Sequence, residues 1–174
     1  MHMQTISVDG LLFDFDDDWK ITKYDDWKFY KNFCSVGNGM KAVDLLAISP
    51  ESHLYLIEVK DYRFHRRQKS AEINDEMCLK VVDTLAGLLP AKLNSDIPAE
   101  QIFATAALAC NKIRVVLHLE QATEGSRLSP RRFRSEDIAD KMRKQLRTID
   151  RRAVASDRRN MSRMNWTCRS EPIA

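Results

Sequence analysis

The sequence has few of the residues that mark flexible, fibrous or membrane-spanning chains. It contains only five glycines and five prolines among 174 residues, which excludes collagen-like repeats and long flexible linkers. No apolar run is long enough to cross a bilayer, so we expect no membrane partner. The first ten residues lack both a basic and an apolar segment, which predicts that there is no secretory signal and that the protein is cytoplasmic.

Cysteine is also scarce, and its four positions follow no metal-binding or disulfide pattern. The sequence has no Cys-x-x-Cys pair and no histidine placed to complete a zinc set. In a reducing compartment such residues behave as small hydrophobic side chains. We therefore expect four buried free thiols, at Cys34, Cys78, Cys110 and Cys168.

Length and composition favour one domain that spans residues 1–174. A chain of 20.2 kDa that is 44% hydrophobic and 30% charged can build one core and is too apolar for general disorder. Charge is unevenly distributed: residues 112–174 hold 16 Lys and Arg against 8 Asp and Glu, whereas residues 1–111 hold 12 against 17. This basic C-terminal part predicts a polyanionic partner, with nucleic acid first, and solubilising surface charge is the alternative.

Hydrophobic patterning predicts a mixed α/β fold with a strand-rich N-terminal meander. Short runs in which aromatic residues alternate with Lys or Asp predict strands at residues 11–15, 19–24 and 27–33. Two apolar runs joined by a short turn then predict a strand–turn–strand hairpin at residues 40–48 and 54–60.

The second half of the sequence predicts helices and further strands. Helices are expected from Ser70 to about residue 93, with Ser70 as the cap, and from Pro98 to residue 109. A third helix starts at Ser135, and Ile138, Met142 and Leu146 form its apolar face. The remaining strands are expected at residues 113–119 and 164–169.

The hairpin within residues 40–62 is the most informative segment. If its turn is centred on Glu51, Asp44 lies directly opposite Glu58. Because side chains alternate between faces along a strand, Lys60 lies on the same face as Glu58. Two opposed carboxylates on an apolar sheet repel each other, and a divalent cation would remove this conflict. Oxygen ligands without nearby thiols or imidazoles favour Mg²⁺ or Mn²⁺.

These residues resemble the motif of the PD-(D/E)XK nuclease superfamily, which has the restriction-endonuclease-like fold. Val43-Asp44, a thirteen-residue gap and Glu58-Val59-Lys60 carry the resemblance, which extends over roughly residues 40–93. It implies a mixed sheet flanked by helices, and a Mg²⁺-dependent endonuclease that hydrolyses phosphodiester bonds, in DNA in preference to RNA. It also implies that Asp44, Glu58 and the Val59 carbonyl bind the metal, while Lys60 orients or activates the attacking water.

The sequence departs from the motif in two respects. Val43 stands where the motif name has proline, and residues 1–39 show no helical periodicity where the superfamily has a core helix. An additional upstream acid would have to be Asp25 or Asp26, and a solvated turn is the favoured interpretation of that pair.

Other candidate residues carry weaker signals. The loop at residues 61–67 mixes aromatic and basic side chains, including His65, and could grip phosphates. His65 and His118 could be general bases, but His118 is better interpreted as a core or rim histidine. Lys80 could point toward the substrate, and a solvated helix face is the favoured interpretation. The arginine-rich stretches at residues 127–134 and 151–163 are expected to contact phosphates or face solvent.

Two functions of different classes therefore remain open. One is the metal-dependent nuclease, whose catalytic residues would be Asp44, Glu58 and Lys60. The other is a catalytically inactive nucleic-acid-binding or accessory subunit that keeps the same fold. A homodimer and a subunit of a larger assembly are both compatible with the size of the chain. For the hairpin itself, the structural alternative is an ordinary strand pair that ends in solvated charges.

Overall fold

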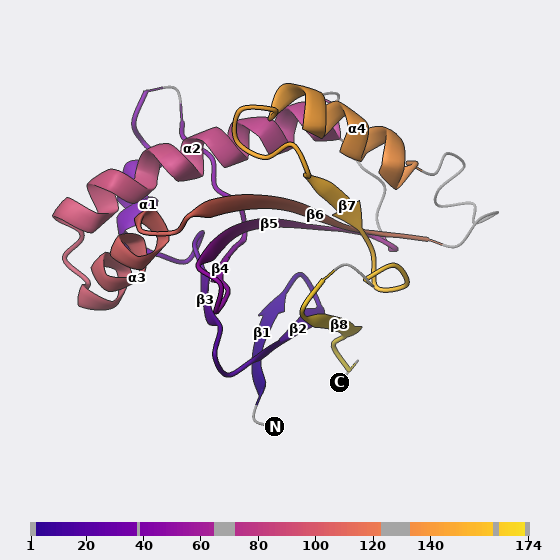
Figure 1. Ribbon diagram of the computed structural model, residues 1–174, viewed down its shortest axis with the longest axis horizontal. Coiled ribbons are helices and arrows are strands. Elements are labelled where there is room, and N and C mark those ends of the chain that lie inside the picture. The colour runs from indigo at the N-terminus through magenta and orange to yellow at the C-terminus, as the bar shows by residue number, and fades with distance from the viewer. Residues whose placement is uncertain (1–2, 38, 65–71, 123–132, 162–163, 173–174) are drawn as a thin grey trace.

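A computed structural model describes residues 3–37, 39–64, 72–122, 133–161 and 164–172 of the chain (Figure 1). The larger of its two sheets contains β3 (Lys20–Lys23), β4 (Leu45–Ile48), β5 (His53–Tyr62), β6 (Lys112–Gln121) and β7 (Val154–Ser156), in that order. The β3–β4 and β4–β5 pairs are antiparallel, whereas β6 and β7 continue the sheet in parallel with β5. The smaller sheet is antiparallel and consists of β1 (Met3–Val8), β2 (Leu11–Asp16) and β8 (Thr167–Ser170).

Helices and the smaller sheet cover opposite faces of the five-stranded sheet (Figure 1). The helices are α1 (Lys28–Phe33), α2 (Ile73–Asn94), α3 (Pro98–Leu108) and α4 (Ser135–Gln145). Strand β5 is buried on both faces: Leu54 and Leu56 pack into the core under the helices, whereas Ile57 and Val59 pack into the core formed with the smaller sheet. Strand β5 is therefore central, which explains its long apolar sequence.

The predicted hairpin register is confirmed. Leu45 pairs with Ile57 and Ile48 pairs with Leu54, so the turn is centred on Glu51. The first strand is shorter than predicted, because β4 begins at Leu45 and residues 40–44 are not part of a strand. Asp44 thus lies immediately before the strand, where its side chain can reach the backbone of β5.

The strand predicted at residues 27–33 is wrong, because α1 occupies this segment. Its first amides are satisfied by Glu100 of α3, whose carboxylate accepts hydrogen bonds from the N–H groups of Lys28 at 2.7 Å and Phe29 at 3.2 Å. Phe29 and Phe33 stack one helical turn apart. A helix end that is capped by a distant segment leaves no local capping signal in the sequence.

The other predicted elements agree with the structure to within a few residues, with two omissions. The helices at α2, α3 and α4 and the strands at β2, β3, β6 and β8 are confirmed, whereas β1 and the three-residue β7 were not predicted. Ile138, Met142 and Leu146 are buried as expected. Ser70 lies outside the described residues. The mixed α/β class is thus confirmed, while the specific restriction-endonuclease-like arrangement is not established.

Two further expectations can be compared with the fold. All four cysteines are free, but each is partly exposed and not buried. In the described part of the chain, none of the helices combines the length and the apolar character that a membrane crossing requires.

The crossing of α2 over α1 provides a stability test. Gly87 in α2 lies against the buried Tyr24, and a Cβ atom at position 87 would overlap the Tyr24 hydroxyl and lie 3.1 Å from the Phe33 ring. Gly87→Ala should therefore lower the free energy of unfolding by about 1–3 kcal/mol, although alanine is the better helix former. Chemical denaturation measures this change.

Tyr24→Phe is the matched rescue variant for Gly87→Ala. The Tyr24 hydroxyl is buried and makes no hydrogen bond, so its removal alone should be neutral or slightly stabilising. In the Gly87→Ala background it should recover much of the lost stability, because it removes the overlapping atom. Equal destabilisation with and without the Tyr24 hydroxyl would contradict this account of the contact.

Candidate functional site

Four residues singled out from the sequence meet where α2 crosses β5: Asp44, Glu58, Lys60 and Lys80. Glu58 and Lys60 both project from β5 toward α2, and the Lys60 Nζ lies 2.5 Å from the Glu58 Oε1. The Glu58 side chain is only 1% exposed, and that of Lys60 is 20% exposed. The prediction that Glu58 and Lys60 share one face is confirmed.

Lys80 of α2 is a member of the same cluster. Its Nζ lies 2.6 Å from the Glu58 Oε1 and 3.8 Å from the Asp44 Oδ1. The prediction that Lys80 lies on a solvated helix face is wrong, because only 15% of its side chain is exposed. Glu76, one turn earlier on α2, lies 3.7 Å from Lys60. Glu76 was not singled out from the sequence, and the signal that could have revealed it is its spacing of four from Lys80 on the helix face that also carries Met77.

Asp44 is held by the backbone of β5. The Val59 N–H donates a hydrogen bond of 2.6 Å to the Asp44 Oδ2. Asp44 and Glu58 therefore approach the same ammonium group, and in this structure the cation between the two carboxylates is Lys80. We define the charged cluster as Asp44, Glu58, Lys60, Glu76 and Lys80.

Burial sets the electrostatics of the charged cluster. It raises the pKa of Glu58 to about 7, with the Asp44 charge adding to the effect and the two lysines opposing it. Burial also raises the pKa of Asp44, against the charge of Lys80 and the Val59 hydrogen bond. The pKa of Lys60 is raised despite its burial, because the Glu58 carboxylate stabilises the ammonium form. The cluster is thus a compensated set of buried charges, in which each ion depends on its partners.

One of the two upstream acids belongs to the same electrostatic environment. Burial and the nearby Asp44 charge raise the pKa of Asp25, and its Oδ1 is buried without a hydrogen bond. Asp26 is exposed and pairs with Lys23 at 3.4 Å. The solvated-turn interpretation therefore holds for Asp26 but not for Asp25.

The predicted Mg²⁺ or Mn²⁺ site has only part of a donor set. Within the described ranges, no three or more His, Cys, Asp or Glu side chains are grouped so that they could hold a metal ion. The Glu58 Oε2 is buried without a hydrogen-bond partner and is the one oxygen of this residue that an ion could use without displacing a lysine. The metal site and the role of the Val59 carbonyl remain predictions.

The remaining candidates divide into structural residues and residues that cannot be placed. His118 is a buried histidine whose Nε2 lies 3.1 Å from the Glu120 Oε1, as expected for a core residue. Arg63 forms a close ion pair with Asp61 at 2.6 Å. The predicted phosphate-gripping residues from His65 to Arg67, and residues 127–132 of the first arginine-rich stretch, lie outside the described residues.

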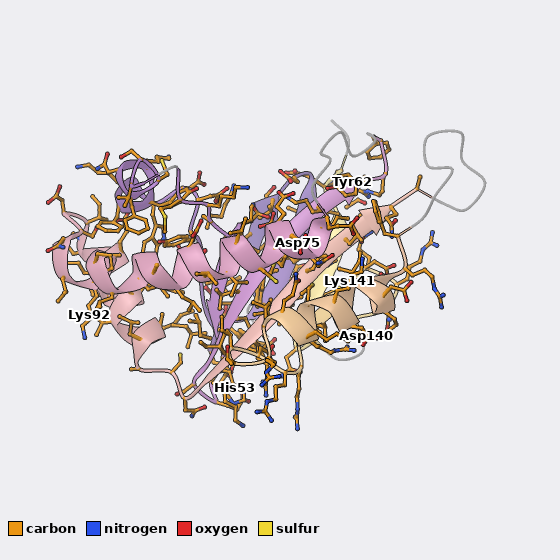
Figure 2. The ribbon with its side chains drawn as sticks, turned by 90° about the horizontal axis from the view of Figure 1, so that it is seen from above. His53, Tyr62, Asp75, Lys92, Asp140 and Lys141 are labelled. Atoms are coloured by element: carbon orange, nitrogen blue, oxygen red, sulfur yellow. The ribbon has the colours of Figure 1, made fainter. Side chains whose placement is uncertain are left out.

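An arginine-lined cavity of about 500 Å³ lies near the other end of β5 and β6. Its charged lining consists of Arg114 from β6, Arg143 from α4, and Arg151 and Arg152 from the turn before β7, and Tyr55 contributes an aromatic ring. Figure 2 shows side chains with nitrogen tips gathered at the end of the sheet where His53 is labelled. Arg151 and Arg152 of the 151–163 stretch thus line a concave basic surface. The sequence predicted only that this stretch contacts phosphates or faces solvent.

Asp150 holds together the backbone segments beside this cavity. Its buried carboxylate accepts hydrogen bonds from the Val115 N–H at 2.8 Å and the Arg152 N–H at 2.8 Å, and it pairs with Arg114 at 3.3 Å. The turn that carries Arg151 and Arg152 is therefore attached to the start of β6. Arg143 is fixed separately, because its Nε donates to the Ala153 carbonyl at 2.9 Å. The Arg143 guanidinium also pairs with Asp140 at 2.8 Å, so the exposed Arg151 and Arg152 are the residues best placed to bind phosphate oxygens.

Comparison with known proteins gives one informative relative. The chain is 34% identical to a cysteine–tRNA ligase of Neisseria meningitidis serogroup A, over 79% of this chain and 24% of the ligase. The chain thus spans about a quarter of the length of this relative. No family model matches the sequence, and no solved structure matches it.

This relative overturns the nuclease identification. A protein that resembles a tRNA ligase over most of its length is not expected to be a Mg²⁺-dependent endonuclease, so the assignment to the PD-(D/E)XK superfamily and the predicted phosphodiester hydrolysis are wrong. The reason for the error is that an acid-x-Lys motif on an apolar strand is short. It specifies a charge arrangement, and the structure shows that a pair of lysines can neutralise this arrangement internally.

The raised pKa of Glu58 predicts a pH dependence of stability. The pKa of this carboxyl is about 7 in the folded state against an ordinary 4.5, so between these values the folded state binds more protons than the unfolded state. Its contribution to stability should therefore grow as the pH falls from about 7 toward 4.5, and Glu58→Gln should lose this gain. Urea unfolding of both proteins across this range provides the measurement. Glu136→Gln, at an exposed site on α4, is the control, and identical pH profiles for wild type and Glu58→Gln would refute the assignment.

The metal prediction can be tested separately, because the Lys80 ammonium on the Glu58 Oε1 would repel an ion bound at the neighbouring Oε2. Lys80→Met frees the Glu58 Oε1 from one ammonium and should tighten Mn²⁺ binding by about tenfold, whereas Glu58→Gln should abolish it. Isothermal titration calorimetry with Mn²⁺ measures both effects, and circular dichroism checks folding. The absence of saturable Mn²⁺ binding in wild type and in Lys80→Met would remove the predicted site.

Proposed function

We propose that this chain is a tRNA-binding accessory module that serves the charging of tRNA with cysteine. The observation that carries the proposal is the 34% identity to a cysteine–tRNA ligase over 79% of the chain. Within that role, the basic surplus of residues 112–174 favours binding of the tRNA. This role corresponds to the nucleic-acid-binding alternative that the sequence left open, with tRNA in place of DNA.

The arginine-lined cavity supports this proposal as the tRNA contact. Guanidinium groups bind phosphodiester oxygens in a planar, bidentate manner that a lysine cannot reproduce. Arg151 and Arg152 have exposed side chains, and the turn that carries them is held by Asp150. The basic surplus of residues 112–174 surrounds this turn in sequence, which favours attraction of a polyanion.

The charged cluster supports a binding role through its closed arrangement. Glu58 is held by both Lys60 and Lys80, and Asp44 by the Val59 amide, so these groups hold one another in place. In such a module the cluster attaches α2 to β5, whereas the cavity lies near the other end of β5 and β6. The proposal therefore assigns tRNA contact to the arginines and a structural role to the cluster.

Charge reversal at the cavity tests the proposal. The double variant Arg151→Glu/Arg152→Glu should weaken tRNA binding by about tenfold or more, and it should reduce the slope of log affinity against log salt by about 2. Filter binding or fluorescence anisotropy with tRNA at several salt concentrations measures both quantities. A DNA duplex of similar length serves as a comparison ligand and should bind more weakly.

A matched control separates local contact from net charge. Lys31→Glu/Lys92→Glu makes the same change in charge at two exposed lysines on α1 and α2, away from the cavity, and should reduce affinity far less. Equal losses in the two double variants would remove the cavity from the proposal. A wild-type protein that shows no saturable binding to tRNA would overturn the proposed function.

A further inference from the structure

We propose that the arginine-lined cavity holds one unpaired nucleotide of the RNA, with its base against apolar side chains and its phosphate on Arg151 and Arg152. This inference rests on the proposed function, because it takes RNA as the polyanion that the cavity contacts. It goes further by naming the part of the RNA that is bound. The module would then recognise a loop or a strand end, where bases are free of a helix, and not the helical stems.

The cavity has an apolar side as well as a basic one. Four of the apolar residues that line it, here named the floor, are Tyr55, Val116, Val154 and Met164. Val116 belongs to the core between the two sheets, and the other three pack against that core. Tyr55, Val154 and Met164 are nevertheless only half-buried. The core between the sheets is therefore open to the cavity at this end, which leaves apolar surface for a ligand to cover.

The pairing of the strands explains why these side chains share one face. Val116 of β6 is the register partner of Val154 of β7, and Arg114 of β6 is the register partner of Tyr55 of β5. Residues 114 and 116 are two apart, so all four side chains leave the sheet on the same side. This side carries the smaller sheet and lies opposite the helices (Figure 1). Arg114 thus stands beside Tyr55, where the floor meets the basic side.

Tyr55 provides a fixed aromatic surface. Its ring centroid lies 5.2 Å from that of Trp19 and 5.3 Å from that of Trp166, and both tryptophans are buried. Because two large rings already hold Tyr55 in place, a ligand does not have to order it. Bases of single-stranded RNA bind proteins by stacking on aromatic side chains and on the planes of arginine guanidinium groups. Tyr55 and Arg114 provide both kinds of group next to each other.

The exposed arginines provide the phosphate contact. Arg114 is paired with Asp150 at 3.3 Å, whereas the side chains of Arg151 and Arg152 are exposed. A second cavity of about 490 Å³ is bordered by the same three arginines and by Lys112. The sugar–phosphate backbone of a strand that places a base in the first cavity can thus continue past Arg151 and Arg152 into the second.

The volume and lining of the cavity favour an unpaired nucleotide over a helix. About 500 Å³ lies within the range of roughly 300–1,000 Å³ that is usual for small-ligand sites. In a duplex the bases are paired and stacked inside the helix, so only backbone groups would meet the arginines and the floor would stay uncovered. An unpaired base can leave the strand and cover the floor. tRNA offers such nucleotides in its loops and at its 3′ end.

A series of RNA ligands tests the base contact with the wild-type chain. Fluorescence anisotropy compares three ligands of equal length: a single-stranded RNA, its duplex with the complement, and an abasic single strand that keeps the phosphates. The single strand should bind about tenfold more tightly than the abasic strand, since stacked bases add to the phosphate contacts. It should also bind more tightly than the duplex, although a surface that contacts only phosphates favours the higher charge density of the duplex.

Val154→Trp fills the cavity from its floor and leaves the arginines in place. It should lower the affinity for the single strand by about tenfold, with an unchanged slope of log affinity against log salt, because the phosphate contacts remain. Val82→Trp, at a 51% exposed position on α2 outside the cavity lining, is the matched control and should bind like wild type. Circular dichroism checks that both variants fold, and the ligand series does not depend on either of them.

Photochemical cross-linking locates the base. Irradiation of a single-stranded RNA that contains one 5-iodouridine couples this base to an aromatic side chain in contact with it, and peptide mass spectrometry should identify Tyr55. Phe64 is the alternative aromatic residue, because it is 62% exposed and its ring centroid lies 5.1 Å from the Arg63 guanidinium carbon. A cross-link to Phe64 in place of Tyr55 would move the base contact to the other end of β5 and overturn the proposal.

The binding results separate this inference from the proposed function. Equal affinity for the single strand and the abasic strand, or a preference for the duplex, would overturn the nucleotide site while the tRNA-binding role stands. Undiminished binding of the single strand by folded Val154→Trp would lead to the same conclusion. A wild-type chain that binds none of these RNAs and no tRNA would overturn the proposed function, and this inference with it.

Discussion

The burial of Glu58 beneath α2 is the constraint on which much of this structure depends. A carboxylate that is 1% exposed in the central strand requires cations at short distance, and Lys60 and Lys80 supply them from the strand and from the helix. Because Lys80 must reach Glu58, the rotation of α2 about its axis is restricted. The same rotation places Met77 and Val81 in the core and leaves Leu79, Val82 and Leu89 exposed. One buried charge therefore connects the packing of the sheet to the surface that α2 presents.

The two groups of charged residues differ in their relation to solvent. In the charged cluster, opposite charges compensate one another, and burial raises the pKa of both Glu58 and Asp44. At the arginine-lined cavity, one buried acid, Asp150, holds the backbone of a turn whose arginines remain exposed. Compensated buried charges stabilise a particular packing, whereas exposed guanidinium groups on a fixed turn remain available to phosphates. This contrast is the physical basis for proposing that the cavity contacts tRNA and that the cluster has a structural role.

The motif at the hairpin shows how a correct geometric prediction can accompany a wrong functional one. The register about Glu51 is confirmed, and Glu58 and Lys60 share a face as predicted. The inference from that geometry to a nuclease fails, because the chain resembles a tRNA ligase. The sequence favoured a solvated helix face for Lys80, whereas Lys80 supplies from α2 the cation that the prediction assigned to a metal. A local motif does not report which groups from elsewhere in the chain will neutralise it.

The sequence by itself determined the elements that have strong local periodicity. The apolar positions of α2, α4, β5 and β6 repeat at helical or strand spacing, and the symmetric hairpin determines the pairing of Leu45 with Ile57. Only the tertiary structure decided the features that depend on distant partners. α1 forms because Glu100 caps it from α3, and the arginine cavity forms because Asp150 joins a late turn to the start of β6. Hydrogen bonds and ion pairs between remote segments leave no periodic signal, since they depend on where the folded chain brings single residues together.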